Sequence, residues 1–229
     1  MKRGVRDIRP EASSKKKIAL VTGASRGLGY ETCVLLATKG IHVIGVARTV
    51  GGLESLSDKI EQSGGTSTMI PLDITNYLQV ENLGPSLVKN WQKIDYFVHL
   101  AAVAAPLSPA PNLSLDDYDS ALNTNARATL NLIRIIHPVL KMAKDGQALF
   151  VDDNTDGKFF SSYAASKAAS RAILNCYRKE NERLGPKVTI FHPSAMPTAL
   201  RAKFFPGENK THLSSCNSQA KILIKKLGL

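Results

Sequence analysis

Cysteine is scarce in this chain, with three among 229 residues. Cys33, Cys176 and Cys216 are too few for a disulfide framework and too scattered to form a CxxC pair of metal ligands. The sequence therefore predicts no metal site. A reducing compartment, the cytoplasm, is the simplest location for such a protein.

Long apolar runs are missing as well. Residues 1–17 carry basic side chains but no apolar core of a signal peptide, and no later stretch is long and apolar enough to cross a bilayer. We therefore expect a cytoplasmic protein that has no membrane as a partner. Residues 1–16 are expected to form a flexible basic arm, and residues 17–229 to fold as one domain.

Acidic residues are outnumbered by basic ones, 19 to 30, which leaves a formal charge of +11. Such an excess raises the question of nucleic acid or an anionic membrane as a partner. Much of it lies near the two ends of the chain, and no aromatic-studded basic stripe or zinc-finger spacing accompanies it. Nucleic-acid binding is therefore not expected as the main function.

A glycine-rich stretch, TGASRGLG at residues 22–29, follows a short apolar run and precedes a stretch with helical periodicity at residues 30–39. At such a strand-to-helix turn, Gly23 permits the bend, Gly27 lets backbone N–H groups approach a pyrophosphate, and Gly29 allows close packing. The start of a helix also favours anions. The stretch predicts nucleotide binding, and a purely structural turn is the alternative.

Beyond this turn, apolar strand-like runs alternate with amphipathic helical stretches. Strands are expected at residues 18–22, 41–47, 66–72, 94–101, 147–151 and 187–191, and helices after the first turn at residues 52–62, 77–89, 116–142 and 161–184. The alternation predicts an α/β fold, a single doubly wound domain with a mainly parallel sheet of about six strands. Its ligand is expected at the carboxyl ends of the strands.

The end of the second expected strand bears on the choice of cofactor. An acidic residue there would bind the ribose 2′-hydroxyl of NAD, but the chain has Arg48, and Arg26 stands inside the glycine stretch. Two guanidinium groups could converge on a 2′-phosphate, so NADP(H) is favoured over NAD(H), which stays the alternative. Arg48 could also be a solvated loop residue.

The ends of the third and fourth strands carry further candidates. Asp73 could accept a hydrogen bond from the adenine amino group while Ile74 flanks the ring, or Asp73 could cap the next helix. Ala101 and Ala102 are small enough to let the backbone approach the cofactor ribose. His99 is interpreted as a structural residue rather than as an acid–base catalyst.

Tyr163 and Lys167 form the second strong motif. Their i, i+4 spacing places the phenol and the ammonium group on one helix face. A nearby lysine charge favours phenolate and would lower the tyrosine pKa from about 10 toward neutrality, where it can exchange protons. Taken alone, the pair could also be an ordinary helix face.

Together these motifs resemble the short-chain dehydrogenase/reductase family over residues 17–198. Residues 22–29 match its TGxxxGxG loop, and Tyr163 with Lys167 matches its YxxxK pair. The resemblance implies a Rossmann fold and an NADP(H)-dependent oxidoreductase that interconverts a small-molecule carbonyl compound and its alcohol by hydride transfer. Tyr163 is then the proton donor or acceptor, and Lys167 lowers its pKa and holds the ribose hydroxyls.

The same resemblance gives roles to further residues. Asn125 matches the family's helix Asn, which would support a water relay behind Lys167, and residues 192–198 match the loop that flanks the nicotinamide. Related proteins commonly pair two helices, which implies a homodimer or homotetramer through residues 116–142 and 161–184. The expected cofactor-binding residues are Gly23, Ser25, Arg26, Gly27, Leu28, Gly29, Arg48, Asp73, Ile74, Ala101, Ala102, Tyr163, Lys167 and Thr198.

One departure concerns the family's substrate-orienting serine, because the chain has Asp152 and Asp153 where it is expected. An ionised carboxylate repels the negative charge that develops on a carbonyl oxygen, so an enzyme without another donor is expected to be slow on simple ketones. A protonated Asp, or Thr155, Ser161 or Ser162, could supply the donor; we favour a slow enzyme or a substitute hydroxyl. The alternative function is a catalytically impaired dinucleotide-binding or sensing module.

The end of the chain departs from the family too. No seventh strand is expected, and a short helix is expected near residues 218–227. Residues 199–215 are interpreted as a mobile lid over the substrate, with Phe204 and Phe205 offering an apolar surface. An exposed loop pinned by those two rings is the alternative.

Overall fold

The computed structural model describes residues 16–153 and 155–229. The basic arm expected at residues 1–16 lies outside them except for Lys16. Six strands form one parallel sheet in the order β3-β2-β1-β4-β5-β6, which confirms the predicted doubly wound class. The strands are β1 Ile18–Thr22, β2 His42–Ala47, β3 Ser67–Pro71, β4 Tyr96–His99, β5 Gln147–Val151 and β6 Lys187–Phe191.

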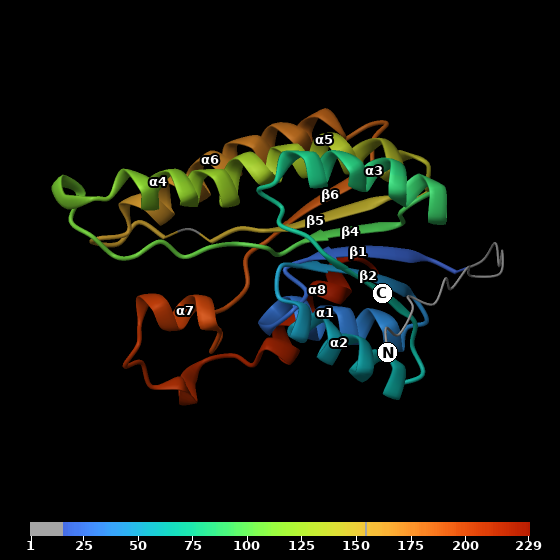
Figure 1. Ribbon diagram of the computed structural model, residues 1–229, viewed down its shortest axis with the longest axis horizontal. Coiled ribbons are helices and arrows are strands. Elements are labelled where there is room, and N and C mark those ends of the chain that lie inside the picture. Colours follow the sequence, from blue (N-terminus) through green and yellow to red (C-terminus); the bar gives the residue numbers. More distant parts are fainter. Residues whose placement is uncertain (1–15, 154) are drawn as a thin grey trace, which may run out of the picture.

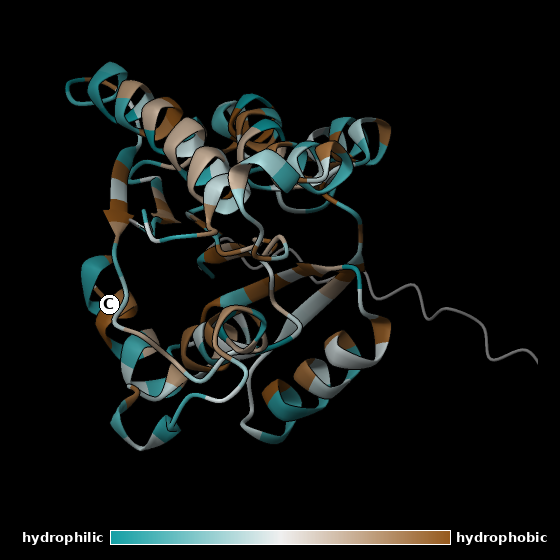
Figure 2. Cartoon of the chain, turned by 90° about the vertical axis from the view of Figure 1, so that its left-hand side faces the viewer, coloured by the Kyte–Doolittle hydropathy of each residue, from teal (hydrophilic) through white to brown (hydrophobic). Residues whose placement is uncertain are grey.

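Helices cover both faces of this sheet (Figure 1). They are α1 Gly27–Thr38, α2 Val50–Gln62, α3 Tyr77–Trp91, α4 Leu115–Leu122, α5 Ala128–Lys141, α6 Ser161–Glu180, α7 Ala199–Phe204 and α8 Cys216–Lys226. One layer contains α3, α4, α5 and α6, and the other contains α1, α2 and α8. Helices of both layers carry hydrophobic and hydrophilic residues side by side, as Figure 2 shows.

The sheet is buried between two hydrophobic cores because successive side chains of a strand point to opposite faces. Leu20 of β1 belongs to the core under α3, α5 and α6, whereas Ala19 and Val21 belong to the core over α1, α2 and α8. All five residues of β1 are buried. The near-continuous apolar strands of the sequence are explained by this double burial.

The order of the strands reverses at β1, which pairs with β2 on one side and with β4 on the other. The loops that follow β1 and β4 therefore diverge to opposite faces, and a crevice opens between them at the carboxyl ends of the strands. The glycine stretch follows β1, and residues 100–102 follow β4. The topology places the two predicted cofactor segments at the same crevice.

The prediction of one continuous helix at residues 116–142 is wrong in one respect. It is divided into α4 and α5 by a π-helical segment, η2, at Asn123–Arg127. Asn125 lies in this segment, and its amide exchanges hydrogen bonds with the backbone of Val103. Single π turns inside helices are often found at functional sites. Here the wider turn carries Asn125 to the loop after β4.

The last part of the chain has more regular structure than the sequence predicts. Residues 199–215 contain the helix α7 and a 3-10 turn, η3, at Lys210–His212. Helix α8 packs against α1 beneath the sheet, and the described residues contain no seventh strand. Among all the residues that the structure describes, no helix is both long and apolar enough to span a membrane.

Candidate active site

The glycine stretch forms a tight turn that only glycine can make at two positions. Gly23 has a φ of +73°, and a Cβ added to it would lie 2.8 Å from the backbone nitrogen of Ala101. A Cβ on Gly29 would lie 2.1 Å from the carbonyl oxygen of Gly23. The backbone therefore lies close to the loop after β4 at Gly23 and close to itself at Gly29, where close packing was predicted.

The N-terminus of α1 is open for an anion. Its first helical residue is Gly27, and the capping residue Arg26 makes no side-chain hydrogen bond to the first turn. The first N–H groups of a helix have no partner within the helix, and the helix dipole adds positive potential there. This geometry suits a phosphate group.

One cavity of about 480 Å³ lies along the carboxyl ends of the strands. Every residue predicted to bind the cofactor or to take part in catalysis lines it. The two motifs that are far apart in the sequence, the glycine stretch and the Tyr163–Lys167 pair, thus meet in one site. The cavity also brings in Asp153 and Arg201; the sequence offered Asp153 only as one of several candidates and gave no signal for Arg201.

The part of the cavity that follows β2 and β3 contains an exposed guanidinium group and a carboxylate. Arg48 lies 3.9 Å from Asp73, whose side chain accepts hydrogen bonds from Thr75 N and Oγ1 at 2.9 and 2.8 Å. Burial opposes ionisation of Asp73, but the Thr75 bonds and the Arg48 charge outweigh it and lower the pKa. The cap of α3 is Asn76, so the alternative of Asp73 as the cap is wrong.

His99 is held inside the protein by two threonines. Its Nδ1 lies 2.7 Å from Thr22 Oγ1, and its Nε2 lies 3.0 Å from Thr129 Oγ1. Burial, helped by the charge of Lys167, lowers the pKa of His99 to about 3. The ring is therefore neutral at physiological pH and has both nitrogens engaged, as expected for a structural residue.

Tyr163 and Lys167 lie on the inner face of α6, one turn apart. Tyr163 is only 3% exposed, and its Oη donates a hydrogen bond to Asp153 Oδ2 at 3.2 Å. The Lys167 ammonium group donates to the carbonyl oxygen of Val151 at 2.9 Å. The i, i+4 spacing thus places both groups beside the end of β5.

The pKa of Tyr163 shifts in the direction opposite to the expected one. Burial raises it, and the charges of Asp153 and Asp152 raise it further, because all three oppose a phenolate. Burial also lowers the pKa of Lys167. The prediction that Lys167 brings Tyr163 toward neutrality is therefore wrong for this arrangement.

The two adjacent aspartates have different surroundings. Asp152 is 1% exposed and is paired with the Arg171 guanidinium group, so it is a structural ion pair. Asp153 faces the cavity, and its Oδ1 accepts a hydrogen bond from Thr155 Oγ1 at 2.9 Å. Ser162 points away from the cavity and donates to the Asp117 carbonyl oxygen. Of the five described candidates for the serine position, Asp153 alone lines the cavity.

Asn125 joins the loop after β4 to the tyrosine helix. Its Oδ1 accepts from Val103 N at 2.9 Å, and its Nδ2 donates to Val103 O at 3.0 Å and to Ser166 Oγ at 2.9 Å. Ser166 in turn donates to the Tyr163 carbonyl oxygen. Asn125 therefore fixes α6 against the cavity wall, and its part in a water relay stays a prediction.

Helix α7 covers the tyrosine from the other side. The Phe204 ring lies 4.9 Å from the Tyr163 ring and 4.8 Å from the Phe160 ring, measured between centroids. Phe204 is buried, whereas Phe205 is 42% exposed. Thr198 caps the helix by accepting from Arg201 N. Residues 199–215 thus contribute an apolar cover over Tyr163, and their movement as a lid stays a prediction.

The polar side chains of this site are bonded to one another. The described residues contain no group of three or more His, Cys, Asp or Glu side chains that could hold a metal ion. The buried His99 is bonded to two hydroxyl groups, and Asp152 is bonded to a guanidinium group.

Comparison with known sequences finds two reductases that each resemble this chain over part of their own length. The chain is 29% identical over 194 residues to a glycine betaine reductase of Emericella nidulans, covering 83% of this chain and 15% of that protein. It is 30% identical over 172 residues to a fatty acyl-CoA reductase of Acinetobacter baylyi, covering 72% of this chain and 58% of that protein. The chain thus spans less than two thirds of either relative.

Solved structures resemble the whole fold. A short chain dehydrogenase of Shigella flexneri complexed with NADP is 26% identical, with a TM-score of 0.83, and the match covers 88% of this chain and 86% of that one. One of Escherichia coli complexed with NADPH is 25% identical, with a TM-score of 0.85 and coverages of 96% and 93%. The family model described as short chain dehydrogenase matches residues 17–209. The chain therefore belongs to the short chain dehydrogenase family of oxidoreductases.

Proposed function

We propose that the protein is an NADP(H)-dependent oxidoreductase that interconverts a small-molecule carbonyl compound and its alcohol, with Tyr163 as the proton donor or acceptor. One observation carries this proposal: the glycine turn and the Tyr163–Lys167 pair open onto the same cavity of about 480 Å³. A volume of this order suits a small-molecule or cofactor site. Family membership and the complexes of two relatives with NADP and NADPH support the same reading.

The residues of the cavity fit a dinucleotide. Gly23 and Gly29 let the turn close tightly on the loop after β4 and on itself, and the open N-terminus of α1 that follows suits a pyrophosphate. Arg26 and Arg48 line the same cavity and would pair with a 2′-phosphate, which favours NADP(H) over NAD(H). When bound, the nicotinamide supplies or takes up the hydride.

The chain itself positions the substrate and moves the proton. Tyr163 is fixed by Asp153 at its hydroxyl group and by Phe204 at its ring, so its oxygen has a defined direction. Lys167, held by the Val151 carbonyl oxygen, presents donors toward the ribose side of the cavity. Preorganised groups of this kind act without reorganising during the reaction.

A dinucleotide-binding or sensing module with impaired catalysis is the second candidate. A specific observation favours it, namely that the phenol of Tyr163 is 3% exposed and is bonded to a carboxylate in place of a hydroxyl group. Such a module needs only the glycine turn and the open end of α1. It predicts cofactor binding without turnover.

Turnover measured together with binding separates these two candidates. The purified chain would be titrated with NADPH and NADH by fluorescence, and then assayed with a panel of alcohols against NADP⁺ and of aldehydes and ketones against NADPH. The proposal predicts tighter binding of NADPH than of NADH and turnover of at least one pair. Binding without any turnover would favour the module, and no binding would contradict both.

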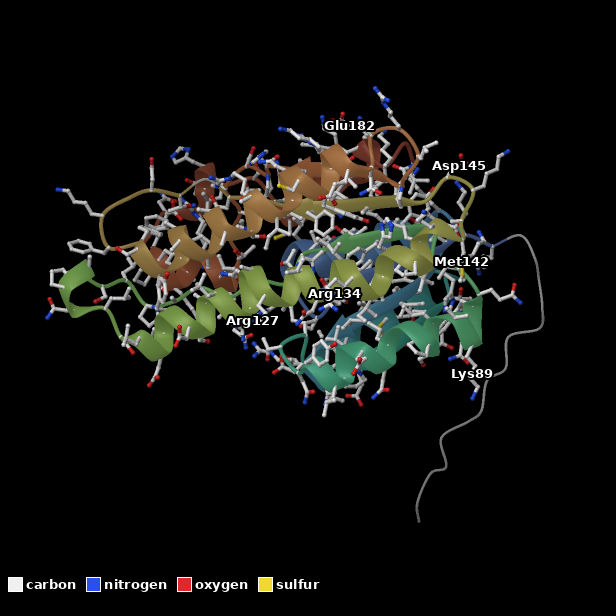
Figure 3. The ribbon with its side chains drawn as sticks, turned by 90° about the horizontal axis from the view of Figure 1, so that it is seen from above. Lys89, Arg127, Arg134, Met142, Asp145 and Glu182 are labelled. Atoms are coloured by element: carbon white, nitrogen blue, oxygen red, sulfur yellow. The ribbon has the colours of Figure 1, made fainter. Side chains whose placement is uncertain are left out.

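We also infer a homodimer or homotetramer through the outer faces of α5 and α6, as in the family. Leu130 of α5 is 41% exposed there, and Ala172 of α6 is exposed. Arg127 at the end of η2 and Arg134 of α5 are exposed on the face seen in Figure 3, so the pairing has to accommodate their charges. Light scattering at micromolar concentration tests the inference, and a monomeric mass would contradict it.

A further inference from the structure

Asp153 connects the buried phenol of Tyr163 to solvent. The Tyr163 Oη donates to Asp153 Oδ2 at 3.2 Å. Tyr163 is only 3% exposed, whereas Asp153 is an exposed residue on the cavity wall. A proton on the phenol therefore has a short path to water through this carboxylate.

The direction of this hydrogen bond selects the form of substrate that fits. A phenol has one proton to donate, and in this arrangement the proton lies toward Asp153. The lone pairs of the phenol oxygen are then left to accept a hydrogen bond. An alcohol can donate that bond, whereas a ketone cannot, so the carboxylate form of Asp153 suits the alcohol.

The surroundings of Tyr163 oppose a phenolate. Burial and the charges of Asp153 and Asp152 raise the pKa of the phenol. A phenol that receives one proton while it gives away another stays neutral throughout. This exchange avoids the phenolate that the surroundings oppose.

We propose that Asp153 is the proton acceptor of Tyr163 during alcohol oxidation, an inference that rests on the proposed function. The substrate O–H bond breaks and its proton passes to Tyr163 Oη, while the Oη–H bond breaks and its proton passes to Asp153 Oδ2. The electron pair of the substrate C–H bond leaves as hydride to the nicotinamide of NADP⁺, and the C=O bond forms. Asp153 then gives its proton to water. Reduction reverses every step and uses the carboxylic acid form.

Charged groups surround Asp153 on each packed element. Helix α6 contributes Lys167 and Arg171, and α7 contributes Arg201; Asp152 precedes Asp153 in the chain. Arg171 is paired with Asp152, and Arg201 is paired with Glu208. Thr155 donates to the other oxygen of Asp153 and so leaves Oδ2 toward the phenol. Both arginines therefore have acidic partners of their own, which leaves Lys167 to offset the charge of Asp153, and the accepting oxygen is oriented.

The proposal fixes a pH dependence with opposite signs for the two directions. Oxidation uses the carboxylate form of Asp153, so its rate is expected to rise from acidic pH and then level off. Reduction uses the carboxylic acid form, so its rate is expected to fall over the same pH range. The competing explanation is that Asp153 merely replaces a serine that would donate a hydrogen bond to the substrate. That explanation predicts neither of these two pH dependences, and it predicts faster ketone reduction in Asp153→Ser.

The test is Asp153→Asn, which keeps the shape and the hydrogen bond to Tyr163 but cannot take up the proton. Asp156→Asn is the matched control, because it removes the same charge from an exposed position in the same loop. Asp153→Asn is expected to slow both directions by about 10²–10⁴, the usual contribution of a positioned proton-transfer group, and to lose the acidic limb of the oxidation profile. NADP(H) affinity should stay near that of the wild type. Retained activity with an unchanged profile, or a faster Asp153→Ser variant, would overturn the proposal.

Infrared difference spectra of the cofactor-free chain across an acid titration give a readout that does not need turnover. The carboxyl band of Asp153 should appear with a simultaneous shift of a tyrosine C–O band. The carboxyl band should vanish in Asp153→Asn, the tyrosine shift should vanish in Tyr163→Phe, and both should persist in Asp156→Asn. A carboxyl band without the tyrosine shift would overturn the proton link. Wild-type protein that binds NADP(H) but oxidises no alcohol would instead contradict the proposed function.

Discussion

The two halves of the cavity are built in different ways. The half formed by β1, β2 and α1 is made mainly of backbone: glycines that allow close approach and a helix end with open N–H groups. The half formed by β5, α6 and α7 is made of side chains, with Tyr163 between Asp153 and Phe204. The first half carries the predicted glycine pattern, and the second has Asp153 where the resemblance predicts a serine.

This difference has a physical cause. A backbone cradle needs a small set of glycines at fixed spacing, and any other residue there meets the chain itself. A site made of side chains tolerates substitutions, because other residues can form a hydrogen-bond arrangement around the same tyrosine. Asp153 and Thr155 form such an arrangement around Tyr163. Binding and chemistry should therefore respond to different substitutions, and four predictions test that separation.

Tyr163→Phe should have the largest effect and should act on chemistry alone. The ring still packs against Phe204, and only the proton-exchanging oxygen is lost. We expect turnover to fall by about 10³–10⁴ with NADPH affinity nearly unchanged, measured by initial rates and fluorescence titration. Lys167→Met should harm both, since Lys167 is assigned to the ribose as well. A Tyr163→Phe protein that keeps most of its activity would show that the assigned role is wrong.

Gly23→Ala should weaken cofactor binding by the half of the cavity that β1, β2 and α1 form. Its φ of +73° strains any L side chain, and its Cβ would lie 2.8 Å from the Ala101 nitrogen. We expect about 2–4 kcal/mol lower free energy of unfolding and weakened NADPH binding, measured by urea denaturation and titration. Gly40→Ala is the matched control, since its φ is +75° but no atom lies within 4 Å of the added Cβ. Equal losses in both variants would mean that strain, and not the close approach, decides.

Arg48→Asp should change the choice of cofactor within the same half. Arg48 is 65% exposed at its side chain and can turn from Asp73 to a 2′-phosphate. Losing charge-assisted hydrogen bonds of about 1.5–3 kcal/mol should narrow or reverse the preference for NADPH over NADH by roughly 10- to 100-fold. Affinities for both cofactors, measured in both proteins, decide the matter. Equal affinities in the wild type would remove the argument from Arg26 and Arg48.

His99→Asn should change stability at low pH and have little effect on either half. The folded pKa of His99 is about 3, below the ordinary value of 6.5, so the unfolded chain binds more protons between these values. Stability is then fully present above the unfolded pKa and falls as pH drops, by about 2 kcal/mol between pH 7 and pH 5. Urea denaturation of His99→Asn at both pH values should show a smaller fall, with His212→Asn, an exposed histidine, as control. Identical pH dependence in all three proteins would contradict the assigned burial effect.

The fold could be predicted from the sequence to a large extent, because buried parallel strands have a plain apolar signal. The bounds of β1, β5 and β6 agree with the prediction, and the glycine spacing locates the cofactor crevice. The π-helical segment at Asn123–Arg127 gave no such signal, since hydrophobic periodicity continues through it. Asn125 of this segment accepts a hydrogen bond from Val103 N, 22 residues earlier in the chain, which periodicity does not reveal.

The site was predicted in its residues but not in its electrostatics. Spacing alone places Tyr163 and Lys167 on one face of α6. It does not show that Asp153 turns toward the phenol while Asp152 turns toward Arg171, or that Phe204 covers the ring. The direction of the Tyr163 pKa shift is set first by burial and then by the charges of Asp153 and Asp152. Each of those three contacts joins segments whose relative position only the folded chain defines.

One titration tests the separation of the two halves most directly: NADPH binding to the wild type, Gly23→Ala, Tyr163→Phe and Asp153→Asn, followed by fluorescence under identical conditions. The account predicts weakened binding in Gly23→Ala alone, with the other two variants near the wild type although they have lost turnover. Binding that falls as far in Tyr163→Phe and Asp153→Asn as in Gly23→Ala would contradict it, because cofactor binding and proton transfer would then depend on the same residues.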